Sequence, residues 1–318
     1  MPVITVDNLV KRFAGRAVLA GVSLRVEQGE TVAVLGRSGT GKSVLLKSII
    51  GLMDPDEGRV TILDRDLHAM NEAERLHARK DIGYVFQGAA LFDSLTVQEN
   101  VGFALYQLRV PEQEIRDKVR ERLRMVGLEH AIDQYPSELS GGMQKRVGLA
   151  RAIINLPKVV LYDEPTTGLD PVTTDVINQI ILRLRAKLGV TSVVVTHDVK
   201  SAFTISDRII MLDQGRIVAE GTPEQIQASD NAWVQHFIHG RALESERVDT
   251  KMLPAVSRVS VRVRRAAAAD GAPIAGAERR DASGAAMPTP TATPTLPAAP
   301  DVVEPGDFDA NDSATRGS

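Results

Sequence analysis

The chain has 318 residues, with 38 Lys and Arg against 41 Asp and Glu, so its formal net charge is −3. Cysteine is absent, which excludes a disulfide-stapled secreted domain and any zinc or iron–sulfur site built on cysteine. The basic excess of a free-standing nucleic-acid-binding protein is missing, so no nucleic-acid partner is expected. No apolar run approaches the roughly 18–20 residues that span a bilayer, and the N-terminal residues lack the apolar core of a signal peptide.

Composition divides the chain near residue 240. Residues 1–240 alternate apolar segments with glycine-punctuated turns, as a globular domain does. Residues 241–265 are expected to form a linker, of which Val256–Arg265 alternates apolar and basic side chains. Residues 266–318 are rich in Ala, Pro, Thr and Asp and cannot bury enough apolar surface to fold, so we expect a disordered tail.

The order of apolar runs and glycine turns predicts an α/β domain. Short apolar runs that end at a polar group are typical of buried parallel strands, and the stretch at about residues 88–150 favours helices. In chain order, we expect antiparallel strands at Ile4–Val6 and Leu24–Val26, a buried strand at Thr31–Leu35, a helix at Lys42–Ile50, buried strands at Val159–Tyr162 and Val193–Thr196, and a hairpin at Ile209–Gly221 that turns at Gln214–Gly215.

The sequence GRSGTGKS lies between the expected strand Thr31–Leu35 and the helix that follows it. This is the context of a phosphate-binding loop, in which glycines let successive backbone N–H groups face a phosphate at the helix start. Lysine supplies a positive charge to the β- and γ-phosphates, and the last hydroxyl binds Mg²⁺. The candidate ATP-binding residues are Gly36, Arg37, Ser38, Gly39, Thr40, Gly41, Lys42 and Ser43.

Two carboxylates end the expected strand VVLYDE. Alone, an acidic pair after a strand is most often a helix cap. With a phosphate-binding loop in the same chain, Asp163 is placed to hold Mg²⁺, and Glu164 is placed to polarise an attacking water. Nucleotide hydrolysis is therefore the expected reaction.

A third motif, LSGGM, precedes a helix-forming stretch. Ser140, Gly141 and Gly142 would open that helix with exposed N–H groups and a hydroxyl, which makes a second anion site. Such a site is useful if it closes on the nucleotide of another subunit. In isolation, the same pentapeptide is an ordinary serine cap.

Taken in order, these motifs resemble the nucleotide-binding subunit of an ABC transporter, and the resemblance runs across residues 1–240. It implies an α/β P-loop NTPase with a RecA-like core, an antiparallel β subdomain and a helical lobe. By this resemblance Gln87 senses Mg²⁺ and the attacking water, and His197 contacts the γ-phosphate. Asp170 would belong to a loop at the dimer interface. Phe13 fits the ring that stacks on adenine, with a core aromatic as the alternative.

The resemblance also implies partners. One phosphate-binding loop and one LSGG motif per chain imply a head-to-tail homodimer that encloses two ATP molecules with Mg²⁺. Closure and release of that dimer would drive separate permease subunits, which places the protein at the cytoplasmic face of the inner membrane. Met143 departs from the family, since most members carry Gln at this position.

The stretch LFDSLTVQENV and the LSGGM motif are similar to the Mla-type phospholipid transporters and the related Mce systems. That branch pairs the ATPase with a permease, an Mce-domain lipid-binding protein and a STAS-domain protein, and moves phospholipids between membranes. Leu91, Phe92 and Leu95 form either a docking surface for the permease or part of the core. Importers of amino acids or another small solute share every catalytic motif and are the alternative. Non-transport ABC ATPases of DNA repair or ribosomes need a coiled-coil insertion or two cassettes, which this sequence lacks.

Overall fold

A computed structural model describes residues 1–241, so the expected linker beyond residue 241 and the expected tail lie outside the described residues. The strands are β1 (Pro2–Phe13), β2 (Arg16–Glu27), β3 (Thr31–Leu35), β4 (Glu57–Ile62), β5 (Ile82–Val85), β6 (Val159–Asp163), β7 (Thr191–Thr196), β8 (Arg208–Asp213) and β9 (Arg216–Gly221). The helices are α1 (Lys42–Ile49), α2 (Glu72–Ala78), α3 (Val97–Gln107), α4 (Glu112–Met125), α5 (Gly141–Ala152), α6 (Pro171–Leu188), α7 (Val199–Ile205), α8 (Pro223–Gln227) and α9 (Ala232–Ile238).

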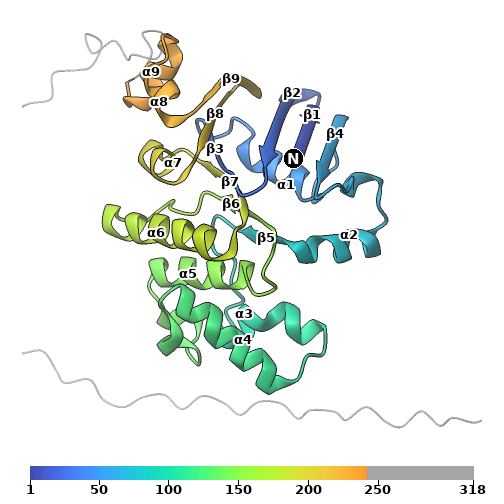
Figure 1. Cartoon of the computed structure of the whole chain (residues 1–318), viewed down its shortest axis with the longest axis vertical. Coiled ribbons are helices and arrows are strands. Elements are labelled where there is room, and N and C mark those ends of the chain that lie inside the picture. The colour runs from blue at the N-terminus through green and yellow to red at the C-terminus, as the bar shows by residue number, and fades with distance from the viewer. Residues whose placement is uncertain (242–318) are drawn as a thin grey trace, which may run out of the picture. The chain divides into compact units, whose positions relative to one another are not determined.

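A six-stranded sheet in the order β5-β6-β7-β3-β8-β9 forms the centre of the fold (Figure 1). Neighbouring strands from β5 to β8 run parallel, and β9 joins the edge antiparallel. The strand order is not the chain order because the connections cross over through helices, as parallel pairing requires. The expectation of buried parallel strands after residue 30 is confirmed.

The parallel strands are apolar throughout because both faces of the sheet are covered. Successive side chains point to opposite faces, and β6 shows the result. Val159 and Leu161 join the core shared with α1 and the antiparallel sheet. Val160 and Tyr162 join the core shared with α6 and the helical lobe. Each strand thus contributes to two cores.

The second sheet is antiparallel, in the order β2-β1-β4. Ile4 pairs with Val26 and Val6 with Leu24, so the strands expected here pair with each other. They are longer than expected, at 12 residues each. The hairpin expected late in the chain is formed by β8 and β9. Its turn at Gln214 and Gly215 has φ values of 45° and 74°, the left-handed pair that a tight two-residue hairpin requires.

Between β5 and β6 the chain forms helices without strands, as expected for the helical lobe. Figure 1 shows α3, α4 and α5 packed together on one side of the sheet. In α4 the buried residues Ile115, Val119 and Leu123 recur every four positions, which gives one apolar stripe on an otherwise charged helix. In the part of the chain that the structure describes, no helix is long and apolar enough to cross a lipid bilayer.

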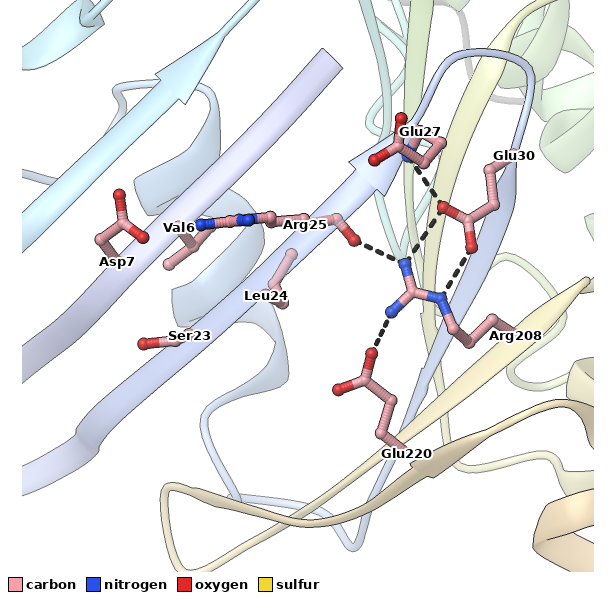
Figure 2. A pocket seen from close by; sticks show the side chains of 9 residues that line it. All are labelled: Val6, Asp7, Ser23, Leu24, Arg25, Glu27, Glu30, Arg208 and Glu220. Atoms are coloured by element: carbon pink, nitrogen blue, oxygen red, sulfur yellow. Dashed lines mark hydrogen bonds and ion pairs between the residues drawn. The ribbon is translucent and has the colours of Figure 1, made fainter. Parts of the chain in front are cut away.

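Arg208 joins the two sheets through charged contacts (Figure 2). Its guanidinium binds Glu30 at both oxygens, at 2.7 and 3.0 Å, and donates to the carbonyl oxygen of Arg25 in β2 at 2.5 Å. A further ion pair joins it to Glu220 of β9. These groups line a cavity of about 480 Å³. Because Arg208 in this cavity is bound by Glu30, Glu220 and the Arg25 carbonyl, we interpret the cavity as a structural contact between the two sheets.

Candidate functional site

The carboxyl ends of β3, β6 and β7 meet at one edge of the central sheet. Leu35 at the end of β3 pairs with Thr196 at the end of β7, and Asp163 at the end of β6 pairs with Val195. Parallel strands in this register deliver the residues that follow them to the same edge, where open α/β sheets bind ligands. The glycine-rich loop, the carboxylate pair and the histidine therefore come together.

The glycine-rich loop wraps around the side chain of Lys42. This side chain is 5% exposed, and Nζ donates to the carbonyl oxygens of Gly36 at 2.8 Å and Arg37 at 3.0 Å. The hydroxyl of Thr40 donates to the same Arg37 carbonyl at 2.9 Å. The loop is thereby closed on itself, with the ammonium held at its centre.

Gly41 sets the direction in which α1 starts. Its φ is +100°, and a Cβ built there would lie 2.8 Å from Leu19 Cδ2 and 2.9 Å from the carbonyl oxygen of Val18. Only glycine fits both the backbone angle and the space. No side chain of the described residues caps the N-terminus of α1, so its first amides are oriented to bind an anion.

Asp163 is held through both carboxylate oxygens. The Ser43 hydroxyl donates to Oδ1 at 2.7 Å, and the Tyr84 hydroxyl donates to Oδ2 at 3.1 Å. Burial raises the pKa of Tyr84, and the negative charge of Asp163 raises it further, so the phenol stays a donor. Asp163 itself is 5% exposed. Its geometry is thus fixed from β5 and from α1.

Glu164 contacts a different set of residues. Its Oε1 lies 3.3 Å from Lys42 Nζ, and its Oε2 lies 2.8 Å from His197 Nδ1 and accepts from the Thr167 hydroxyl at 3.0 Å. The backbone φ of Glu164 is +49°, a left-handed angle that is uncommon for a residue with a Cβ. Strain of this kind is characteristic of functional sites.

A cavity of about 490 Å³ lies beside these groups. Eight of the residues expected to bind or hydrolyse ATP line it. Phe13 at its rim is 45% exposed, with Lys11 Nζ 5.9 Å from the ring centroid, so the alternative of a core aromatic is wrong. The lining residues are Phe13, Val18, Ser38, Gly39, Gly41, Lys42, Ser43, Val44, Gln87 and Glu164.

The LSGG residues and Asp170 form a second cluster that does not line this cavity. Ser140 caps α5 and accepts from the Met143 amide at 3.3 Å. A Cβ at Gly142 would lie 2.5 Å from Thr173 Cγ2, so the start of α5 packs against the start of α6. Asp170 caps α6 and accepts from the Thr173 hydroxyl at 2.5 Å. That hydroxyl, with the amides of the first turn, lowers the pKa of Asp170.

Sequence reasoning missed three residues that contact the expected site. Tyr84 binds Asp163, and Thr167 binds Glu164. Lys145, on the buried face of α5, donates to the carbonyl oxygens of Gln87 and Glu164. Burial lowers the pKa of Lys145, and the carboxylates of Glu164 and Asp163 oppose that shift. A lysine on the apolar face of a helix was the only available signal for it.

The donor set near Ser43 suits Mg²⁺. Within residues 1–241, no group of three or more His, Asp and Glu side chains is placed to hold a metal ion alone. Mg²⁺ takes oxygen ligands and is usually held by one or two protein groups together with substrate phosphates and waters. Ser43 Oγ and Asp163 Oδ1, 2.7 Å apart, provide two such oxygens beside the phosphate-binding loop.

Comparison with known proteins identifies the family. Residues 19–167 match the family described as ABC transporter. The chain is 40% identical over 241 residues to the probable ribonucleotide transport ATP-binding protein Mkl of Mycobacterium leprae, covering 76% of this chain and 70% of that protein. It is also 40% identical over 280 residues to the sulfate/thiosulfate import ATP-binding protein CysA of Bradyrhizobium diazoefficiens, covering 87% of this chain and 78% of that protein.

A solved structure of an ATP-binding cassette is also similar to this chain. The dimeric, post-hydrolysis structure of the ATP-binding cassette MJ0796, bound to ADP and Pi, superimposes with a TM-score of 0.64 and 36% identity. It covers 69% of this chain and 98% of that one. The fold, the motif order and these likenesses agree with one another, and the chain belongs to the ATP-binding, ATP-hydrolysing subunits of the ABC transporter family.

Proposed function

We propose that this chain powers a membrane transporter by hydrolysing ATP in the cavity beside Lys42. The observation that carries this proposal is the position of Glu164, whose carboxylate contacts both Lys42 and His197. A β- or γ-phosphate entering the loop attracts the Lys42 ammonium away from Glu164. The freed carboxylate then accepts a proton from the attacking water.

Other residues of the site have roles in binding and orientation. The loop Gly36–Ser43 binds the phosphates through its amides, and Phe13 stacks on the base. His197 contacts the γ-phosphate, and Gln87 senses the water and Mg²⁺. Mg²⁺, when bound, neutralises phosphate charge, and its place beside Ser43 and Asp163 is supported by the adjacent oxygens of these two residues.

We propose a head-to-tail homodimer as the working form. The LSGG residues and Asp170 do not line the cavity that holds Lys42 in their own chain. In a head-to-tail dimer, Ser140, Gly141 and Gly142 of one copy would close on the nucleotide held by the other. The solved MJ0796 cassette is a dimer bound to ADP and Pi, which supports this arrangement.

The dimer is proposed to act on permease subunits at the cytoplasmic face of the inner membrane. Phe92 is 46% exposed and packs against Phe103, with ring centroids 4.8 Å apart. Leu91 and Leu95 are only partly exposed, and Leu91 packs on the helical-lobe core. The expected cluster is thus divided, with Phe92 on the surface, and it is Phe92 that we assign to permease docking.

The substrate is proposed to be phospholipid, moved between membranes with an Mce-domain protein and a STAS-domain protein. LFDSLTV and LSGGM support this assignment by their similarity to the Mla and Mce branch. The second candidate is import of a small solute. It is favoured by the CysA likeness, which extends over 87% of this chain, and CysA is named for sulfate and thiosulfate import.

One experiment separates the two candidates. The tagged full chain is purified from membranes in mild detergent, and co-purifying proteins and lipids are identified by mass spectrometry. We expect a permease, an Mce-domain protein and bound phospholipid. A permease with a solute-binding protein would move the assignment to import. The absence of any membrane protein would contradict the transport role.

A further inference from the structure

The loop that carries Gln87 has a strained backbone. Ala89 and Ala90, which follow it, have φ values of +60° and +48°. The left-handed region is disfavoured for alanine, whose Cβ approaches the following carbonyl and whose side chain offers no compensating hydrogen bond. Two such residues in succession keep this conformation only where the surroundings impose it.

Two cations of α5 reach the carbonyl oxygens of this loop. Lys145 Nζ donates to the carbonyl oxygen of Gln87. Arg151 donates through its two terminal nitrogens to the carbonyl oxygens of Ala89 and Ala90, each at 2.6 Å. Hydrogen bonds from charged donors are stronger than neutral ones. Since Lys145 and Arg151 lie six positions apart on one helix, α5 holds the loop at both of its ends.

Helix α5 also packs closely on the loop between these two cations. A Cβ built at Gly148 would lie 3.5 Å from both Cα and Cβ of Ala89. Ala89 is 2% exposed and belongs to the buried core. The loop is therefore pressed against the helix and tied to it by hydrogen bonds, which accounts for its left-handed residues.

Lys145 makes a second contact, with the backbone of Glu164. Its Nζ lies 3.5 Å from the carbonyl oxygen of Glu164, the residue whose φ is +49°. Lys145 is 8% exposed. Within residues 1–241, these two carbonyls are its only polar partners, and no carboxylate forms an ion pair with it. Burial of a cation without an ion pair is costly, so a positional role explains its place better than a stabilising one.

We infer that Lys145 is a positioning residue that fixes the Gln87 loop relative to the backbone of Glu164, with Arg151 holding the rest of the loop. This inference rests on the roles proposed above for Gln87 and Glu164. Helix α5 begins at Gly141, directly after Ser140. A shift of α5 when its N-terminus engages the nucleotide of the partner would therefore move the carbonyl of Gln87. The first turns of α5, from Gly141 to Lys145, would thus link the two candidate sites.

The test is Lys145→Met in the full chain, a change that keeps an unbranched side chain of nearly the same length but removes the donor. We expect kcat for ATP to fall about tenfold or more, because a charge-assisted bond is lost at the site of the chemistry. KM for ATP should stay within twofold, since Lys145 does not touch the phosphate-binding loop. Amide hydrogen exchange should accelerate in residues 86–90, because this loop loses its hydrogen bond from Lys145.

Arg122→Met is the matched control. Arg122 is also a buried cation of the helical lobe, 4% exposed, and its Nε donates to a backbone carbonyl, that of Ile153, at 3.2 Å. It is expected to lower the unfolding temperature while kcat stays within twofold. Unfolding temperatures of all variants are measured so that activities are compared on folded protein.

The outcomes separate this inference from the proposed function. A Lys145→Met protein with kcat within twofold of wild type would overturn the positioning role. An equal loss of kcat in Arg122→Met would overturn it as well, because the effect would then be general destabilisation. Glu164→Gln is measured alongside. If that variant hydrolyses ATP at the wild-type rate, the proposed role of Glu164 fails and this inference with it. If it is inactive while Lys145→Met is fully active, only the positioning role fails.

Discussion

The two adjacent carboxylates at the end of β6, Asp163 and Glu164, have different partners. Asp163 accepts hydroxyl donors from Ser43 and Tyr84, whereas Glu164 faces the Lys42 ammonium and His197. Hydroxyl donors therefore orient Asp163 beside the phosphate-binding loop, whereas Glu164 lies between a cation and an imidazole. These different surroundings match the different roles proposed for the two carboxylates.

Tyr84→Phe tests how Asp163 is held. Near neutral pH the variant should lose about 1–2 kcal/mol of unfolding free energy, because a buried hydrogen bond to a carboxylate is removed. Burial raises the pKa of Tyr84 in the folded protein. Above about pH 10 the unfolded tyrosine ionises while the folded one does not, so the stability that Tyr84 contributes falls as pH rises.

The measurement is urea unfolding of the wild type and the Phe variant from pH 7 to pH 11. The difference between the two unfolding free energies should be constant below about pH 10 and should decrease above it. A gap that stays constant or widens up to pH 11 would show that the pKa of Tyr84 is not raised in the folded state.

At the scale of elements, one buried side chain organises the segment between the Gln87 loop and α3. Asn100 of α3 is fully buried. Its Nδ2 donates to the carbonyl oxygens of Phe92 at 3.0 Å and Leu95 at 2.9 Å, and its Oδ1 accepts from the Phe92 amide at 2.8 Å. These bonds tie the segment to α3, and the segment presents the Phe92 ring on the surface.

Phe92→Ser should separate docking from catalysis. The ring is half exposed, so its loss should change the unfolding free energy little and leave ATP hydrolysis by the isolated protein within twofold. Recovery of permease in the detergent purification should fall severalfold, because an exposed aromatic anchor is removed. Leu76→Ser is the control, since Leu76 of α2 is 65% exposed and lies outside the proposed surface. Equal permease recovery with both variants would count against the Phe92 surface.

The elements next to the motifs and the hairpin of β8 and β9 were predictable from the sequence, and several other elements were not. β3, β6 and β7 are continuous apolar runs that end at chemically distinctive residues, so pattern and motif agree. β4 contains a glycine and several polar residues, and α2 is short and largely exposed, so neither has a clear periodicity. β1 and β2 contain register shifts that interrupt their alternation, which is why only short parts were expected.

Within the candidate site, the residues carried by local motifs could be found, and those that act across the fold could not. Tyr84 reaches Asp163 across 79 positions, and Lys145 reaches Gln87 across 58. No local pattern predicts such contacts, because they depend on which strand neighbours β6 and how α5 packs. The exposure of Phe13 also depends on tertiary packing, which local pattern does not set.

At the scale of the whole molecule, the two clusters of candidate site residues are built on different parts of the fold. The cavity at Lys42 lies at the edge of the sheet, and the LSGG cluster lies where α5 meets α6. In the proposed homodimer, each copy would supply two separate halves of a site. Pairing of two copies would complete both halves at once, so the proposed mechanism depends on ATP-dependent dimerisation.

Glu164→Gln tests ATP-dependent dimerisation. Without the carboxylate, hydrolysis should fall at least about a hundredfold while ATP binding is retained, so the closed pair accumulates. Light scattering of the full-length variant should show its mass double on addition of ATP and remain that of a monomer with ADP. A variant that remains monomeric at saturating ATP would contradict ATP-dependent dimerisation, and one that hydrolyses ATP at the wild-type rate would contradict the role proposed for Glu164.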